Sequence, residues 1–199
     1  MKPCVLFVII EPYADWESAF LSSAIQELGD QQIEVKTVSL DTKPVKTIGG
    51  FTTLPDYRIE ESPDGFLAVI LVGGDSWKRP EAQRVIPLLD KAVKHSRVIG
   101  GICAGSEFLA ANGYVNAVNH TSNGLESIRE WNPNKYTNAA NYLNQQSVRD
   151  GLFVTANGTA SLDFTRDVLL ALAVFPEASI DEWYEFEKLG YVEMVKGQG

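Results

Sequence analysis

The chain has 199 residues, of which 45% are hydrophobic and 22% are charged. It is therefore long enough to bury one substantial core, and its composition excludes the disordered and fibrous classes. We predict one domain over residues 1–199. The formal net charge of −9 argues against a nucleic-acid partner, because neutralising a phosphate backbone requires clustered Lys and Arg.

The first apolar run, "CVLFVII", is too short to cross a membrane and lacks the small-residue cleavage pattern of a signal peptide. We interpret it as a buried strand and predict no membrane partner. The chain has two cysteines, which give no disulfide framework and fit a reducing compartment. The predicted location is therefore the cytoplasm.

Apolar runs of strand length then alternate with segments of helical period. This alternation predicts a three-layer α/β sandwich of the flavodoxin type, with a mostly parallel central sheet and helices on both faces. The predicted strands lie in residues 4–10, 33–40, 66–74 and 97–102, and the predicted helices lie in residues 15–29, 81–96, 106–113 and 160–175.

Two hairpins and a last helix complete the predicted elements. Residues 45–59 contain a Gly-Gly pair between short alternating runs, and residues 141–157 contain an Asp-Gly turn signal. The last helix, near residues 179–191, carries Trp183, Tyr184 and Phe186. We place these aromatic side chains in the core ahead of an interface, because aromatic rings mainly supply buried area.

Ligands of open parallel sheets bind beyond the carboxyl ends of the strands, and three such ends stand out here. The first is followed by a helix on which Glu17 shares one face with Phe20, Leu21, Ala24 and Leu28. Glu17 should therefore point inward, where burial raises the pKa of a carboxyl group. The alternative is a first-turn glutamate that the helix dipole favours.

The second strand end carries Gly73 and Gly74. Without side chains, these residues let the backbone turn sharply and present N–H groups to an anion or a developing oxyanion. The alternative is an ordinary glycine turn after a strand.

Cys103 follows the third strand end, in "GGICAGSEFLAANG", with Gly101, Ala104 and Gly105 beside it. Small neighbours suit a nucleophile on a tight strand-to-helix turn, a nucleophile elbow. The N-terminus of the following helix should lower the pKa of this thiol. The alternative is an inert buried cysteine, which we predict for Cys4, at the opposite edge of the sheet from Cys103, so that the two form no disulfide.

The chain offers two histidines as bases for Cys103. His95 precedes the strand that leads to Cys103, which places it about 20 Å away at about 3.3 Å per strand residue. His120 follows the helix after Cys103 and then a short strand-like run, which can bring the chain back to the sheet edge where Cys103 lies. It is either a catalytic base or a polar loop residue.

Together these segments resemble the ThiJ/PfpI superfamily, which has the class I glutamine amidotransferase-like fold, and here the chain looks like a stand-alone bacterial-type member. The resemblance covers nearly the whole chain, including "ADWESAF", "AVILVGG", "VIGGICAGSEFLAANG" and "NHTSN". It implies that Cys103 is the reactive residue, that a protonated Glu17 donates to the thiolate, and that the Gly73–Gly74 pair and Ala104 form the oxyanion site. It also implies a homodimer.

One departure from the family pattern concerns histidine. Protease-like members carry a histidine directly after the nucleophile, where this chain has Ala104, and some other members carry one where this chain has Asn123. A Cys–His pair would therefore require His120.

The sequence thus predicts a cysteine-dependent hydrolase, of protease or amidase type, in which a thiolate attacks the carbonyl carbon of a small-molecule or peptide substrate without metal or cofactor. The alternatives are a redox or stress-response protein with an oxidisable cysteine, a glyoxalase or deglycase, and a non-catalytic binding module.

Overall fold

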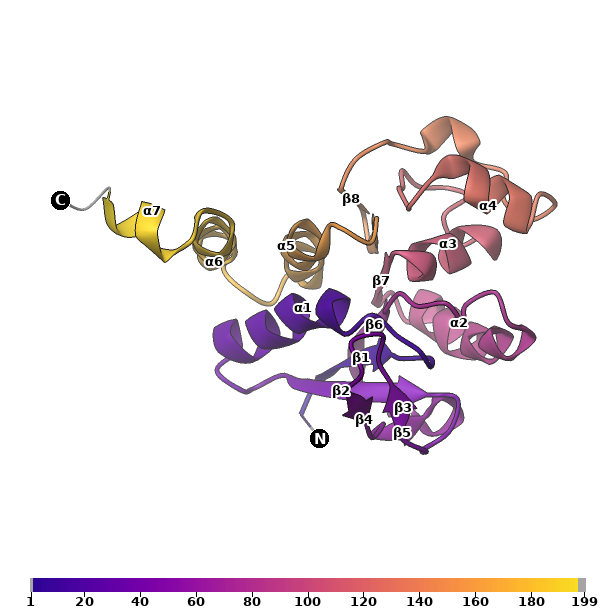
Figure 1. Ribbon diagram of the computed structural model, residues 1–199, viewed down its shortest axis with the longest axis horizontal. Helices are drawn as coiled ribbons and strands as arrows, with labels where there is room; N and C mark the ends of the chain where they lie inside the picture. Colours follow the sequence, from indigo (N-terminus) through magenta and orange to yellow (C-terminus); the bar gives the residue numbers. More distant parts are fainter. Residues whose placement is uncertain (1, 197–199) are drawn as a thin grey trace.

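The computed structural model describes residues 2–196, and its middle layer is a seven-stranded sheet (Figure 1). The strand order is β5-β2-β1-β6-β7-β9-β8. Neighbouring strands are parallel except at one edge, where β8 pairs antiparallel with β9. The strands are β1 (Cys4–Val8), β2 (Glu34–Ser39), β5 (Tyr57–Arg58), β6 (Phe66–Leu71), β7 (Val98–Ile102), β8 (Ser147–Asp150) and β9 (Phe153–Ala156).

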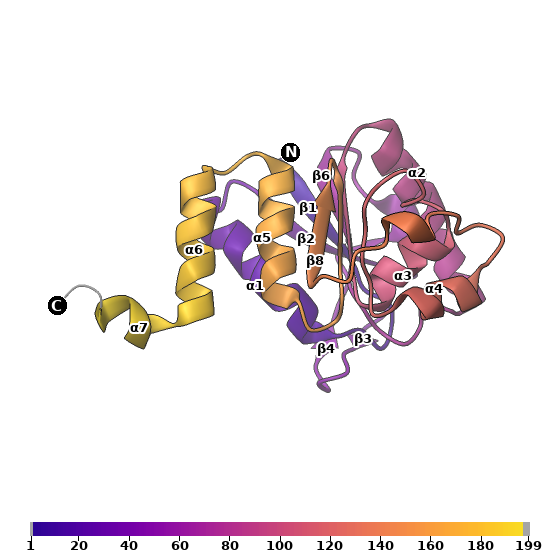
Figure 2. The same ribbon diagram turned by 90° about the horizontal axis from the view of Figure 1, so that it is seen from above.

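Helices cover both faces of this sheet, which gives the predicted three-layer sandwich. One face carries α1 and α5, with α6 packed outside them, and the other carries α2, α3 and α4 (Figures 1 and 2). The helices are α1 (Asp15–Leu28), α2 (Ile86–Lys94), α3 (Ala104–Ala111), α4 (Leu125–Trp131), α5 (Ser161–Leu172), α6 (Glu177–Leu189) and α7 (Tyr191–Lys196), with 3-10 turns at Ile59–Glu61, Pro80–Val85 and Ala139–Asn141.

Strand β1 shows why the sheet needs cover on both faces. Its residues are all buried, and successive side chains point to opposite faces. Val5 and Phe7 join the core beneath α1 and α5, while Leu6 and Val8 join the core beneath α2 and α3. The continuous apolar run therefore fills two cores, as parallel strands covered on both sides do.

Both predicted hairpins are present, with one correction. In the first, β3 (Val45–Lys46) pairs with β4 (Thr52–Thr53) in a separate two-stranded sheet, and Tyr57–Arg58 instead adds β5 to the edge of the main sheet. In the second, β8 and β9 pair antiparallel around Gly151, whose φ of 59° suits glycine.

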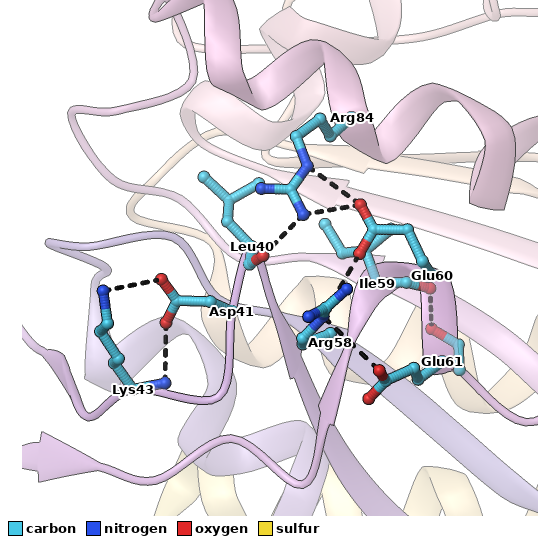
Figure 3. A network of polar contacts seen from close by, with 9 residues as sticks. Leu40, Asp41, Lys43, Arg58, Ile59, Glu60, Glu61 and Arg84 are labelled. Atoms are coloured by element: carbon cyan, nitrogen blue, oxygen red, sulfur yellow. Dashed lines mark hydrogen bonds and ion pairs between the residues drawn. The ribbon is translucent and has the colours of Figure 1, made fainter.

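The β5 edge is fixed by ion pairs rather than by a long ladder (Figure 3). Arg84 donates to Glu60 from both Nε (2.9 Å) and Nη2 (2.6 Å), and Nη2 also donates to the carbonyl of Leu40 at 2.8 Å. Arg58 lies between Glu60 and Glu61, at 3.9 and 3.6 Å. This network links the end of β2 to the 3-10 turns that follow β5 and precede α2.

Two expectations along the chain need correction. The run before His120, expected to be strand-like, forms turns and a bend that lead into the loop before α4. In α6, Trp183 is buried and Tyr184 packs against the core, as predicted, but Phe186 is 41% exposed. Among the described helices, none combines the length and apolar character that crossing a bilayer requires.

Candidate active site

Cys103 lies on a nucleophile elbow, as the sequence predicts. It follows β7 and caps the N-terminus of α3 with φ 56° and ψ −128°, a conformation that costs about 1–3 kcal/mol for a residue other than glycine. Its N–H donates to the carbonyl of Ala156 at 3.0 Å. A Cβ on Gly101 would lie 3.0 Å from the backbone of Gly105, so the tight turn requires small residues.

Glu17 lies directly beneath Cys103. Glu17 is 1% exposed, its Oε2 accepts the N–H of Gly73 at 2.8 Å, and its carboxyl group lies beside the Cys103 thiol. The inward direction agrees with the face that Glu17 shares with Leu21, which is buried, although Phe20 at the edge of that face is 39% exposed. The first turn of α1 therefore places a carboxyl group at the carboxyl end of β6.

Burial raises the pKa of the Glu17 carboxyl from 4.5 to about 7, although the hydrogen bonds from Gly73 and Cys103 lower it. Burial also raises the pKa of the Cys103 thiol to about 11, against the lowering effects of the Asn123 amide and the Ala104 N–H, and the charge of Glu17 adds to the rise. The N–H of Ala104, at the N-terminus of α3, lowers the thiol pKa as predicted, but desolvation outweighs this effect and the net shift is upward. Burial therefore disfavours the charged form of both groups in this pair.

The glycine pair is built into this site, but Gly73 does not have the role predicted for it. A Cβ on Gly73 would lie 2.6 Å from the Cβ of Cys103, and its N–H is already bound by Glu17. Gly74 has φ 156°, a Cβ there would collide with the carbonyl of Pro12, and within residues 2–196 its N–H donates no hydrogen bond. Gly74 and Ala104, whose N–H faces the thiol, remain the available backbone donors.

The structure does not bring His120 to Cys103. The ring is fully buried, with Nδ1 3.0 Å from the carbonyl of Val118 and Nε2 2.7 Å from the hydroxyl of Tyr136. Tyr136 and Tyr142 also pack edge-on against it. Burial lowers the pKa of His120, and both ring nitrogens are occupied, so the ring supports the loop instead of serving as a base at the thiol.

Asn123 stands where a histidine base was sought. Its Nδ2 donates to the Sγ of Cys103 at 3.3 Å, and its Oδ1 accepts the N–H of Gly158 at 2.9 Å. A Cβ on Gly158 would lie 3.0 Å from that sulfur and 3.2 Å from Oε1 of Glu17. The sequence pattern alone assigns no role to Asn123 or to Gly158, although Gly158 follows β9, whose carboxyl end lies at the same sheet edge.

The remaining candidates lie away from the thiol. Cys4 begins β1 and His95 ends α2, both at the amino ends of the strands, and neither cysteine forms a disulfide. Within residues 2–196, no group of three or more His, Cys, Asp or Glu side chains is placed to hold a metal ion.

Comparisons with known proteins agree with this fold. Residues 3–171 match the DJ-1/PfpI family. The chain is 34% identical over 186 residues to Uncharacterized protease YdeA of Bacillus subtilis, covering 94% of this chain and 91% of that one. Among solved structures, it superposes on a thiJ/pfpI family protein of Bacillus anthracis with a TM-score of 0.84 and 28% identity, covering 94% of this chain and 90% of that one. It also superposes on a DJ-1 superfamily protein of Agrobacterium tumefaciens with a TM-score of 0.83 and 29% identity, covering 92% of this chain and 97% of that one. The chain therefore belongs to the DJ-1/PfpI family.

Proposed function

We propose that this protein is a cysteine-dependent hydrolase whose Cys103 sulfur attacks the carbonyl carbon of an amide or ester. The observation that carries the proposal is the contact between a half-buried thiol on a strained elbow and the buried carboxyl group of Glu17. A nucleophile paired with a proton acceptor is the arrangement that covalent catalysis needs. The name of the Bacillus subtilis relative, an uncharacterized protease, supports peptides as one substrate class.

In the proposed reaction, Glu17 replaces His120 as the base. As the bond between Sγ and the carbonyl carbon forms, the thiol proton passes to the Glu17 carboxylate and the carbonyl electron pair moves to oxygen. The N–H groups of Gly74 and Ala104 are the proposed backbone donors to that oxyanion. Its collapse expels the leaving group, which takes the proton from Glu17, and water then hydrolyses the thioester at Cys103.

The pH dependence of acylation tests the role of Glu17. Only the ionised carboxyl group accepts a proton, so the rate of Cys103 acylation by p-nitrophenyl acetate should rise through the Glu17 pKa of about 7. In Glu17→Gln the inflection near pH 7 should disappear and the rate at pH 7.5 should fall about 100-fold. Stopped-flow release of p-nitrophenolate measures the rate, and mass spectrometry identifies the acylated cysteine.

The control for this experiment is Glu11→Gln. Glu11 precedes α1 and accepts the N–H of Lys46 at 2.8 Å, away from the thiol, so its profile should match that of the parent protein. An unchanged profile in Glu17→Gln would exclude Glu17 as the base. Acylation that persists in Cys103→Ser would exclude Cys103 as the nucleophile.

The same donors also suit a second function, a redox response. A protonated Glu17, the Ala104 N–H and the Asn123 amide all face the sulfur and could bind the oxygens of a sulfinate formed with hydrogen peroxide. Oxidation of Cys103 by peroxide without turnover of esters or amides would favour this function. Turnover of 2-oxoaldehydes alone would favour a glyoxalase or deglycase.

A further inference from the structure

Asn123 is the one side-chain amide that contacts the reactive sulfur among the described residues. We propose that Asn123 is a catalytic residue whose Nδ2 donates a hydrogen bond to the oxyanion formed when Cys103 attacks a carbonyl group. The inference rests on the proposed function and assigns it a side-chain donor beside the backbone N–H of Ala104.

The orientation of the Asn123 amide is fixed by its second contact. The N–H of Gly158 can only donate, so the atom that it approaches at 2.9 Å must be the carbonyl oxygen of the amide. The NH₂ group is thereby turned toward the Cys103 sulfur, at 3.3 Å. A donor whose direction is set before the substrate arrives costs no reorganisation during the reaction.

The segment that carries Asn123 is held on both sides. The N–H of Thr121 donates to the Thr155 hydroxyl in β9 at 2.9 Å, and the Tyr142 hydroxyl donates to the carbonyl of Ser122 at 3.2 Å. The buried ring of His120 anchors the start of the segment. These contacts give the amide a rigid support.

The position of the amide suits an oxyanion as well as the resting thiol. Asn123 is exposed and Cys103 is half-buried, so a carbonyl group arriving from solvent meets the amide and the sulfur together. The oxyanion would lie two bonds from Sγ, within the reach of a donor that already contacts Sγ. The N–H of Gly73 already donates to Glu17, so it is not available to the oxyanion. A side-chain donor would take over the role that was expected of this backbone donor.

The competing role for Asn123 is to stabilise the thiolate alone, and two reagents separate the roles. Iodoacetamide alkylates the Cys103 sulfur without forming an oxyanion, whereas p-nitrophenyl acetate acylates it through one. Dividing the acylation rate constant of Cys103 by its alkylation rate constant at the same pH removes any change in the nucleophilicity or accessibility of the sulfur. In Asn123→Ala this ratio should fall about 100-fold.

Asn123→Asp and Asn119→Ala complete the experiment. The aspartate keeps an acceptor for the Gly158 N–H but has no donor for the oxyanion, so its ratio should fall similarly. Asn119 is an exposed asparagine in the same segment whose Nδ2 donates to Asp150 at 2.9 Å, and its alanine variant should keep the parent ratio.

Three outcomes would overturn the inference. A parent-like ratio in Asn123→Ala, with acylation and alkylation slowed equally, would leave Asn123 as a positioning residue for the thiolate. If this ratio of rate constants fell as far in Asn119→Ala as in Asn123→Ala, the effect would come from a disturbed loop and not from the Asn123 amide. A parent protein that is alkylated but not acylated at Cys103 would refute the proposed function, and this inference with it.

Discussion

Cys103 and Glu17 share an environment in which burial disfavours the charged form of both groups. The pKa of each is raised, to about 11 and about 7, and the hydrogen bonds to them only partly offset the desolvation. An ionised carboxyl group in this environment lowers the free energy of unfolding, as groups that are kept for function commonly do. The Glu17 carboxyl group should therefore destabilise the folded protein to a degree that depends on pH, and replacing it with an uncharged group should remove this effect.

Glu17→Gln should stabilise the protein increasingly as the pH rises from 4.5 to 7. Because the carboxyl pKa is about 7 when folded and 4.5 ordinarily, the folded state binds the proton more tightly, and the free energy of unfolding falls over this interval and is constant above it. The shift corresponds to about 3 kcal/mol. Urea unfolding of both proteins at pH 4.5, 6, 7 and 8 measures the difference, and a pH-independent difference would contradict the prediction.

At the scale of elements, the site depends on how closely α3 approaches the sheet. Gly105, in the first turn of α3, lies against the end of β6, where a Cβ would collide with the carbonyl oxygen of Leu71. The elbow at Cys103, two residues before Gly105, depends on this close contact. Helix propensity alone would favour alanine at position 105 by about 1 kcal/mol. For Gly105→Ala, helix propensity therefore predicts a gain in stability and packing predicts a loss.

Gly105→Ala should lower the free energy of unfolding by about 3 kcal/mol, because backbone cannot yield to the added methyl group as a flexible side chain would. Gly65→Ala is the matched control, since Gly65 is exposed and a Cβ there has no heavy atom within 4 Å. It should change stability by less than about 0.5 kcal/mol. Thermal unfolding compares the two, and a Gly105→Ala protein as stable as the parent would contradict the close approach.

Helix α6 lies beyond residue 171, where the family match ends, and packs on α1 and α5 on the outside of the molecule. One domain over residues 1–199, a cytoplasmic location and the absence of nucleic-acid partners stay predictions. Several large apolar side chains are exposed on α1 and the β3–β4 hairpin: Trp16, Phe20, Ile48, Phe51 and Leu54. Apolar surface of this kind favours association, because covering it removes it from water.

The predicted homodimer should appear as twice the chain mass of 21.9 kDa in light scattering at micromolar concentration. Burial of apolar surface is the expected driving force, so raising the salt concentration should not dissociate it. A mass of one chain across the measured range would contradict the prediction.

Local patterns in the sequence predict the layered α/β fold, the elbow at Cys103 and the inward direction of Glu17. These depend on local periodicity and on the rule that parallel strands bring their carboxyl ends to one edge. Which groups meet at the thiol depends on contacts between distant segments of the chain. The contacts from Asn123 to Cys103, from Gly158 to Asn123 and from Gly73 to Glu17 span 20, 35 and 56 residues.

His120 illustrates the same limit. Its residue type suits a base, and the expected return of the chain to the active edge was correct, since Asn123, only three residues later, reaches the sulfur. The ring nevertheless lies between Tyr136 and Tyr142, in a loop that carries turns where a strand was expected. Side-chain direction in such a loop depends on packing against distant residues, and no periodicity in the sequence encodes it.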